Sequence, residues 1–501
     1  MIKSIKPILW TLPVLFVASM ARPAAAYTIQ WNSSWQWYDH AGSQNNIKLD
    51  YDPKCMGSTG QTSTGIGVWS PSKANWNGKV MYWLDGGGMC YDNQSCNVNA
   101  TPSLGNLIAG FASCTNPQAP FVFQKTFAYS DFMTDVNSFG GWDLNGMWKY
   151  KPYLGQGIFD HTVGSTNPFY QYVQVFIPYC SGDAHMGNNT DSADGGHRTH
   201  SGKTFSGLLN AKNAVSYTDA ALTTQDHAPT QSVIAGGSAG GMGAMMDYGW
   251  FRTILPAGER IVTISDAGPL YWSGDEAGGS SWGNPGWQTG SGFLSPAGLG
   301  LPPGGLKGST LSWGVPAKNV TYQEALMAQA WGNSWASPYP STLAITPASS
   351  PNAFYPMQYV LWNNIGNATT DKFFLIDSSN DFIDPWFASM YPNLSQSCVT
   401  CNPACGAGQV CISTGSSGSV CSSLTVANAQ AEITYLFGST TFCQIASTTA
   451  NSLSGAEAWN LHHGFLTNDV STWGTTADTC GKTTTVGSGV TAFLSSIASY
   501  L

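Results

Sequence analysis

Continuous apolar runs recur along the chain, separated by polar and glycine-rich segments. Most of these runs do not alternate with polar residues, which is typical of strands buried on both faces of a sheet. We expect strands at residues 79–84, 172–177, 232–235, 261–264 and 373–376. Helical stretches fall between or after them, at residues 208–222, 241–254, 322–331 and 427–437. Strands that alternate with helices predict an α/β fold with a mostly parallel central sheet flanked by helices.

The first 26 residues have the pattern of a secretory leader. Lys3 and Lys6 precede an apolar stretch from residue 8 to residue 18, and the alanines at 24–26 provide a small-residue cleavage site. The apolar stretch is too short to span a bilayer, and no later segment of the sequence is long enough. We therefore expect one catalytic domain at residues 27–501, exported to the extracellular space or periplasm, without membrane insertion.

The chain contains 12 cysteines, an even number that suits disulfides in an oxidising compartment. Five of them fall within residues 398–421. We interpret this segment as a small disulfide-bonded insertion rather than a zinc site, because no second C-x-x-C stands at zinc spacing. Since five is odd, one cysteine must pair outside the insertion, with Cys443 as a candidate, or stay free.

Charge is scarce and its balance is acidic. Charged residues make up 9% of the chain, compared with roughly 25% in an ordinary domain. Of the 19 basic residues three lie in the leader, so 16 remain against 28 acidic residues, a net charge of −12. This balance argues against nucleic acids and anionic membrane surfaces as partners. We expect a monomer that acts on a neutral or weakly charged substrate.

The segment 236–241 reads Gly-Gly-Ser-Ala-Gly-Gly and follows the predicted strand 232–235. A predicted helix comes directly after it. Strand, sharp turn and helix are the context that a G-x-S-x-G nucleophile elbow requires, with Ser238 as the nucleophile. The alternative is an ordinary serine in a glycine-rich turn. Residues 273–314, rich in Gly, Ser and Pro, follow the next strand and are a candidate lid over the site.

A serine nucleophile requires a base, and the base requires a carboxylate that orients it. Downstream of Ser238 the only histidines are His462 and His463, so one of the two is the candidate base. The acid should follow the next-to-last strand, where Asp377, Asp381 and Asp384 compete. We favour Asp381, because Asp377 lies close to the strand end and Asp384 could cap a helix that begins at the following proline.

Acyl transfer also requires hydrogen-bond donors for a developing oxyanion. One should be the backbone N–H of Ala239, directly after the nucleophile. The second should come from a glycine-rich loop after an early strand. The segment 85–90, Asp-Gly-Gly-Gly-Met-Cys, follows the predicted strand 79–84 and suits this role; the alternative is a plain turn.

Two further polar groups lie after the predicted strand 172–177. Asp183 and His185 should open on the carboxyl edge of the sheet, where they could bind substrate or form a polar network within the loop. Residues 191–200 contain Asp191, Asp194, His197 and His200, which could bind a metal by composition. Because Asp- and His-rich loops are commonly just solvated, we expect no metal there.

Taken together, these motifs resemble the pectin acetylesterase and Notum family of α/β hydrolases. The resemblance spans roughly residues 47–463 and is carried by ordered islands at residues 83–90, 176–183, 237–241 and 265–268. It implies an α/β-hydrolase-like fold and hydrolysis of carboxylic esters without a cofactor. It also implies a triad and backbone oxyanion donors, namely Ser238, Asp381 and His463 with Gly87, Gly88 and Ala239.

The sequence therefore predicts a secreted serine esterase whose substrate is an acetylated polysaccharide, such as pectin or another acetylated glycan. Two alternatives stay open at this point. The family resemblance also allows a deacylase for longer acyl chains or a protein-linked lipid. A binding protein on a hydrolase scaffold that has lost activity would explain the fold without the chemistry.

Overall fold

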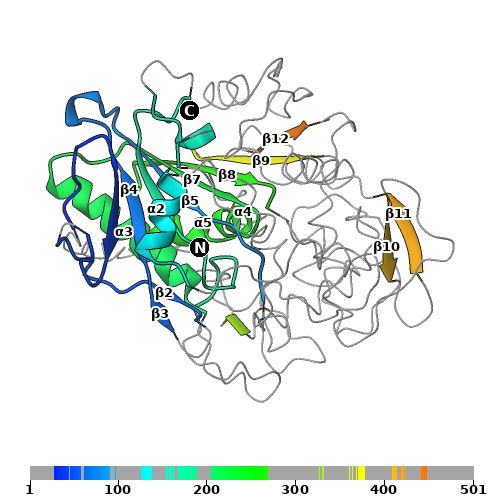
Figure 1. Cartoon of the computed structure of the whole chain (residues 1–501). Coiled ribbons are helices and arrows are strands. Elements are labelled where there is room, and N and C mark those ends of the chain that lie inside the picture. Colours follow the sequence, from blue (N-terminus) through cyan, green and yellow to red (C-terminus); the bar gives the residue numbers. More distant parts are fainter. Residues whose placement is uncertain are drawn as a thin grey trace, which may run out of the picture.

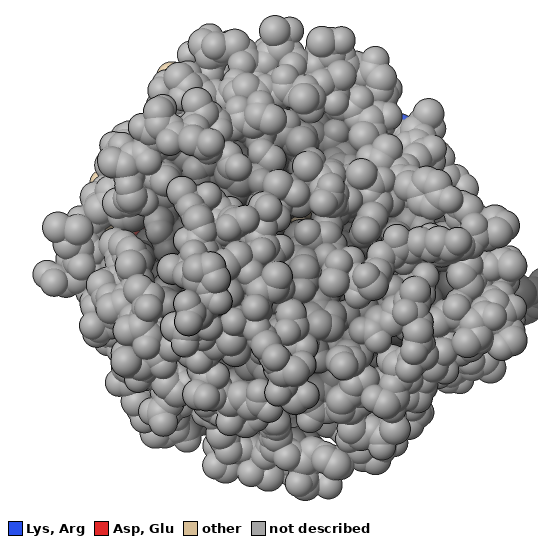
Figure 2. Space-filling view, turned by 90° about the vertical axis from the view of Figure 1, so that its right-hand side faces the viewer, with Lys and Arg blue, Asp and Glu red and all other residues tan. Residues whose placement is uncertain are grey.

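The computed structural model describes the core of the chain and parts of its C-terminal third. The described residues are 27–44, 46–57, 61–90, 96, 126–137, 154–155, 157–162, 167–188, 205–268, 327, 330–331, 360, 364, 368, 370–378, 409–413, 419–423 and 442–447. The predicted leader, the candidate lid at 273–314 and the predicted helix 427–437 lie outside these ranges. In the space-filling view of Figure 2 almost none of the described residues can be seen.

A mostly parallel sheet forms the centre of the fold (Figure 1). In the described part of the chain it has eight strands, in the spatial order β1 (Trp35–Asp39), β4 (Gly65–Trp69), β6 (Val173–Ile177), β5 (Lys79–Leu84), β7 (Gln231–Gly237), β8 (Arg260–Asp266), β9 (Lys372–Ser378) and β12 (Phe442–Ser447). The strands from β6 to β12 are mutually parallel, and β4 pairs antiparallel with β6 and with β1. The carboxyl ends of six strands therefore meet at one edge of the sheet.

Helices cover both faces of the sheet. The α-helices with described bounds are α2 (Tyr129–Asn137), α3 (Gly207–Thr224), α4 (Ala239–Met246) and α5 (Tyr248–Ile254). Two neighbouring residues of β5 contact helices on opposite faces. The Tyr82 hydroxyl donates to the carbonyl of Val215 in α3, at 3.4 Å. The next residue, Trp83, belongs to an apolar core that includes Phe132 of α2. Because successive side chains of a strand point to opposite faces, α2 and α3 lie on opposite sides of the sheet.

The strands form where the apolar runs predict them. All five predicted strands occur, each within two residues of the expected bounds. Every residue of β6 and β7 is buried, as expected for strands covered on both faces. The α/β-hydrolase fold predicted from the sequence is therefore confirmed, with a serine turn at the carboxyl end of the central strand β7.

The helix predicted at residues 241–254 differs in detail. It begins two residues earlier and is interrupted at Asp247, which ends α4 and begins α5. Asp247 has φ −87° and ψ 0°, and its N–H still donates to the carbonyl of Gly243 at 2.9 Å. Strands β1, β4 and β12 were not expected from the apolar pattern; glycine or polar residues stand among the apolar residues of each.

The C-terminal cysteine-rich insertion contains a two-stranded hairpin within its described residues. Strands β10 (Gln409–Ser413) and β11 (Ser419–Ser423) pair antiparallel, with Cys411 opposite Cys421. The hairpin lies apart from the eight-stranded sheet, at the right of Figure 1. Among the helices of the described residues, none has the length and apolarity needed to cross a bilayer.

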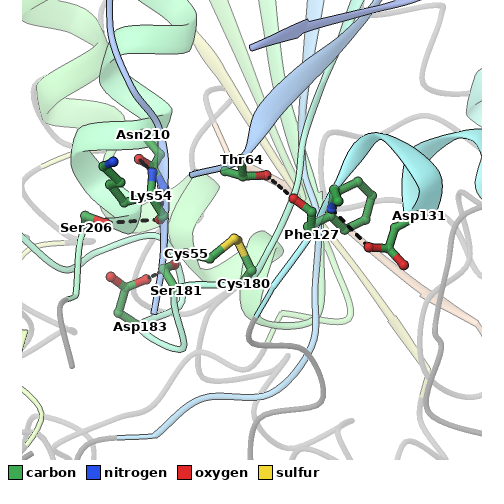
Figure 3. Close-up of a disulfide and its surroundings, with 11 residues drawn as sticks. Lys54, Cys55, Thr64, Phe127, Asp131, Cys180, Ser181, Asp183, Ser206 and Asn210 are labelled. Carbon is green, nitrogen blue, oxygen red and sulfur yellow. Dashed lines mark hydrogen bonds between the residues drawn. A yellow bond between two sulfur atoms is a disulfide. The ribbon is translucent and has the colours of Figure 1, made fainter. Parts of the chain in front are cut away.

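Two disulfides occur in the described part of the chain, and both border the carboxyl edge of the sheet. Cys55, in β2 (Lys54–Cys55), is bonded to Cys180 just after β6, across a sequence separation of 125 residues (Figure 3). β2 pairs with β3 (Thr62–Ser63), and the backbone of Lys54 exchanges hydrogen bonds with the side chain of Asn210 in α3. The second disulfide joins Cys90 to Cys96.

We expect the Cys55–Cys180 disulfide to contribute more stability than the Cys90–Cys96 disulfide. The first closes a loop of 125 residues and the second a loop of 6 residues. In the chain-entropy description, closing the longer loop removes more freedom from the unfolded state, by about 3 kcal/mol. Denaturant unfolding should show a loss of about 2–5 kcal/mol for the double variant Cys55→Ser/Cys180→Ser. The matched Cys90→Ser/Cys96→Ser variant should lose less, and an equal or larger loss would contradict this account.

Candidate active site

Ser238 occupies a strained turn between β7 and α4. Its φ is 54° and its ψ is −124°, a conformation that residues other than glycine rarely adopt. Its N–H donates to the carbonyl of Asp266 at 2.8 Å, and its own carbonyl accepts from the N–H of Met242 at 3.1 Å. A sharp, strained strand-to-helix turn that carries a serine is the geometry of a nucleophile elbow. Backbone strain of this kind costs roughly 1–3 kcal/mol and collects at functional sites.

The main chain around Ser238 approaches the ends of neighbouring strands very closely. A Cβ atom built on Gly240 would overlap the carbonyl oxygen of Leu84 at the end of β5. A Cβ atom built on Gly86 would lie 2.5 Å from the carbonyl oxygen of Gly237 and 3.0 Å from Cβ of Ser238. The glycine loop that follows β5 is therefore in direct contact with the serine turn.

Exposure singles out two residues in this otherwise buried region. Within residues 80–90 and 231–246, only Gly87 and Ser238 are half-buried and all others are buried. Gly87 has φ 153° and Gly88 has φ 76°, conformations that favour glycine over any L-residue. The half-buried serine and the half-buried glycine thus lie on segments that contact each other.

The N-terminus of α4 adds to the electrostatics of the site. The helix begins at Ala239, so the amide of Ala239 belongs to the first turn, whose N–H groups have no partner within the helix. The positive end of the helix dipole favours negative charge at this position. The structure brings the three candidate oxyanion residues, Gly87, Gly88 and Ala239, to the same region around Ser238. Their role as donors stays a prediction.

Asp183 is fully buried in the loop after β6. One carboxylate oxygen accepts from the hydroxyl of Ser181 at 2.6 Å and from the N–H of His185 at 3.1 Å; the other accepts from the N–H of Gly207 at 2.7 Å. Burial raises the pKa of Asp183 to about 6, although these hydrogen bonds act in the opposite direction. Figure 3 shows the hydrogen bond between Asp183 and Ser181. Gly207 is the first residue of α3, so the carboxylate also ties this loop to a helix N-terminus.

His185 is buried in the same loop, with 1% of its surface exposed. Its Nε2 lies 2.9 Å from the carbonyl oxygen of Asp85, the residue between β5 and the glycines. Burial lowers the pKa of His185 to about 4, so the ring is neutral at pH 7. Both Asp183 and His185 thus make internal hydrogen bonds of the kind that a loop network requires. That they bind substrate stays a prediction.

The remaining members of the predicted triad, Asp381 and His463, lie outside the described residues, as does His462. The strands that precede them are described. β9 ends at Ser378, three residues before Asp381, and lies two strands from β7 in the sheet. β12 pairs with β9 at the sheet edge and precedes His463. Because these strands are parallel to β7, their carboxyl ends lie at the edge that carries Ser238.

Two acidic residues near the site were not singled out by the motif analysis as site residues. Asp266, at the carboxyl end of β8, is buried and accepts the N–H of Ser238 through its main chain. Asp247, between α4 and α5, is also buried, and burial together with the nearby Asp183 raises its pKa well above the ordinary value. The sequence held one signal for Asp266: it is an acidic residue directly after the predicted apolar strand 261–264 and its following serine.

The metal motif at residues 191–200 lies outside the described residues. Among the residues that the structure does describe, no three His, Cys, Asp or Glu side chains cluster closely enough to hold a metal ion. The described chemistry is that of a serine in a strained elbow, beside glycine amides and a helix N-terminus. These features define the class of the fold, an α/β-hydrolase-like fold with a serine in the strained turn after the central strand.

Comparison with known proteins agrees with that class. Residues 147–282 match the family model described as Pectinacetylesterase, a segment that contains β6, the Asp183 loop and the serine elbow. No curated protein sequence matches the chain. The structure is similar to that of Notum from Drosophila, a Wnt deacylase, with 16% identity, 65% of this chain and 69% of that chain covered, and a TM-score of 0.33. That overlap is too low to support an inference about this chain.

The family match supports the resemblance to the pectin acetylesterase and Notum family that the motifs indicated. It likewise supports hydrolytic esterase or deacylase chemistry in the general sense. The two disulfides in the described part of the chain are consistent with export to an oxidising compartment.

The close approach at Gly86 yields a direct test of the site geometry. In Gly86→Ala, the new Cβ would force the glycine loop and the serine turn apart, so kcat for ester hydrolysis should fall at least about 10-fold, with a loss of about 1–3 kcal/mol in unfolding free energy. Gly258→Ala is the matched control, because a Cβ there meets no atom within 4 Å. Equal kinetics for the two variants would mean that the loop and the turn are not coupled as described.

Proposed function

We propose that this chain is an exported serine esterase that removes acetyl groups from a polysaccharide. The observation that carries the proposal is the strained Ser238 turn in contact with the glycine loop, with Ser238 and Gly87 as the half-buried residues of that region. The sequence motifs and the family match at residues 147–282 support the same chemistry.

In the proposed mechanism, Oγ of Ser238 attacks the ester carbonyl while His463 takes the hydroxyl proton. Asp381 holds the imidazole in the required tautomer and stabilises its charged form. The tetrahedral oxyanion accepts hydrogen bonds from backbone amides of the glycine loop and of Ala239. When the intermediate collapses, His463 passes the proton to the leaving alcohol, a sugar hydroxyl, and an acetyl-enzyme remains.

Water completes the cycle. His463 now removes a proton from a water molecule, whose oxygen attacks the acetyl carbonyl, and the second tetrahedral intermediate is stabilised by the same amides. Its collapse releases acetate and returns the proton to Oγ of Ser238. Both half-reactions balance without a redox partner, and the proposal includes no cofactor.

Ser238→Ala tests the nucleophile. With nitrophenyl acetate as substrate, we expect kcat to fall about 10⁴-fold or more, because the hydroxyl that attacks the ester is removed. A serine-reactive fluorophosphonate should label the unaltered protein and not the variant. Ser72→Ala is a suitable control, since its hydroxyl makes no capping hydrogen bond. Unchanged turnover in Ser238→Ala, or a folded protein that the probe does not label, would refute the proposal.

Chain length of the acyl group is read in the same assay. Acetate should be cleaved faster than butyrate and octanoate, whereas a preference for octanoate would refute the acetyl assignment and leave the serine mechanism intact.

The acidic balance of the chain bears on the polysaccharide. De-esterified pectin is a polyanion, and a protein with net charge −12 after loss of the leader should repel it. At low ionic strength we expect acetate release from acetylated xylan to equal or exceed that from acetylated polygalacturonate. Added salt should narrow the difference, because it screens the repulsion. Faster release from polygalacturonate at low salt would contradict a neutral glycan as substrate.

A further inference from the structure

The loop that follows β6 holds the glycine loop after β5 through several contacts. Three consecutive glycines have no side chains of their own to fix their conformation, so they depend on external contacts. The N–H of Cys90 donates to the carbonyl of Gly182 at 2.7 Å. A Cβ built on Gly87 would lie 2.9 Å from the ring of Tyr179, which therefore packs directly against that glycine.

His185 supplies the anchor at the start of the glycine loop. A carbonyl oxygen can only accept a hydrogen bond, so the contact of 2.9 Å to Asp85 requires the proton on Nε2 of His185. The N–H of Asp85 donates to the carbonyl of Ile177 at 3.1 Å, which holds the other side of the same residue. Because the peptide group is planar, a fixed Asp85 carbonyl also fixes the direction of the Gly86 N–H.

The same histidine contacts the helix that carries the other oxyanion candidate. A Cβ built on Gly243 of α4 would lie 2.9 Å from Cβ of His185 and 2.5 Å from the carbonyl oxygen of Ala184. His185 is therefore wedged between α4, which begins with Ala239, and the start of the glycine loop. One buried side chain spans the two segments from which the proposed oxyanion donors come.

The backbone of the loop after β6 has an uncommon conformation where it carries His185. Ala184 and His185 have φ of 50° and 61°, the left-handed region in which two successive residues other than glycine are unusual. The N–H of Ala184 donates to the hydroxyl of Tyr179 at 2.8 Å, and the N–H of His185 donates to Asp183. These hydrogen bonds stabilise the strained backbone of Ala184 and His185. Such strain is retained where the position of a side chain matters, here that of the imidazole.

We propose that His185 is a positioning residue of the esterase. Through the hydrogen bond from Nε2 to the Asp85 carbonyl, it fixes the peptide group between Asp85 and Gly86, and thereby the path of the chain that carries the amides of Gly87 and Gly88. It does not contact the substrate. This inference rests on the proposed function, and it replaces the substrate-binding role expected for His185 from the sequence.

Two substitutions at His185 separate the hydrogen bond from the ring volume. His185→Phe keeps a flat ring and removes the donor, whereas His185→Gln can offer an amide N–H near the position of Nε2. With nitrophenyl acetate, we expect kcat of His185→Phe to fall about 10- to 100-fold with KM within about 2-fold, since only transition-state stabilisation is lost. His185→Gln should recover kcat to within about 3-fold of the unaltered enzyme. Melting temperatures establish that both variants are folded.

Each other outcome has a defined meaning. A raised KM with kcat retained would overturn the proposal in favour of substrate binding. Equal loss of kcat in the two variants would show that the donor is not what matters and would overturn it as well. Unaltered kinetics in His185→Phe would overturn it while leaving the esterase assignment intact. If the starting enzyme shows no Ser238-dependent turnover of any ester, the proposed function itself fails first, and the positioning role falls with it.

A measurement on the unaltered protein guards against misfolded variants. In ¹⁵N-histidine-labelled protein, the imidazole resonances of His185 at pH 7 should report a neutral ring protonated at Nε2. A ring protonated at Nδ1 alone, or a charged ring, would overturn the proposal. Should His185→Phe fail to fold, Tyr179→Phe keeps the ring against Gly87 and removes the acceptor of the Ala184 N–H. A lower kcat at constant KM supports the brace, and unchanged kcat counts against it.

Discussion

The close contact of main chain with main chain around Ser238 is the constraint on which the rest of the site depends. The turn after β7 lies so near the end of β5 that Gly240 and Gly86 have no room for a side chain. That proximity brings a glycine loop to the nucleophile, and it requires the strained conformation of Ser238. The strain, roughly 1–3 kcal/mol, is tolerated because β7 is buried and paired on both sides, and because the Ser238 N–H is bonded to Asp266.

The loop after β6 supports this arrangement with a buried polar network. Its two titratable residues shift in opposite directions, since burial disfavours the charged form of each. The pKa of Asp183 is raised from 3.8 to about 6, so the free energy of unfolding falls as the pH rises between these two values. The pKa of His185 is lowered to about 4, so stability falls as the pH drops below the ordinary histidine value. The two effects offset one another in part, and the loop keeps its uncharged histidine across mildly acidic conditions.

Much of the fold could be predicted because its signals are local. The apolar runs of β5 to β9 can be recognised singly, and the alternation with helices implies a parallel sheet. β12 and the antiparallel pair β1 and β4 could not be predicted, since glycine or polar residues stand among their apolar residues and their place in the sheet depends on the strands with which they pair. The break at Asp247 could not be predicted either: α4 packs against β7 and β8 whereas α5 packs against α3, and these tertiary contacts leave no signal in the local sequence.

For the site, the sequence by itself determined the nucleophile candidate and the glycine loop, because each is a short motif whose meaning lies in the residues directly beside it. It also narrowed the base to two neighbouring histidines. Only the tertiary structure decided that Gly86 touches the serine turn and that Asp183 and His185 turn inward. His185 and Asp85 are 100 residues apart, and a hydrogen bond across that distance leaves no periodic trace in the sequence. The serine motif is thus local in the sequence, whereas the contacts that hold the glycine loop arise from the pairing of β5 with β6, which brings the loops after these two strands together.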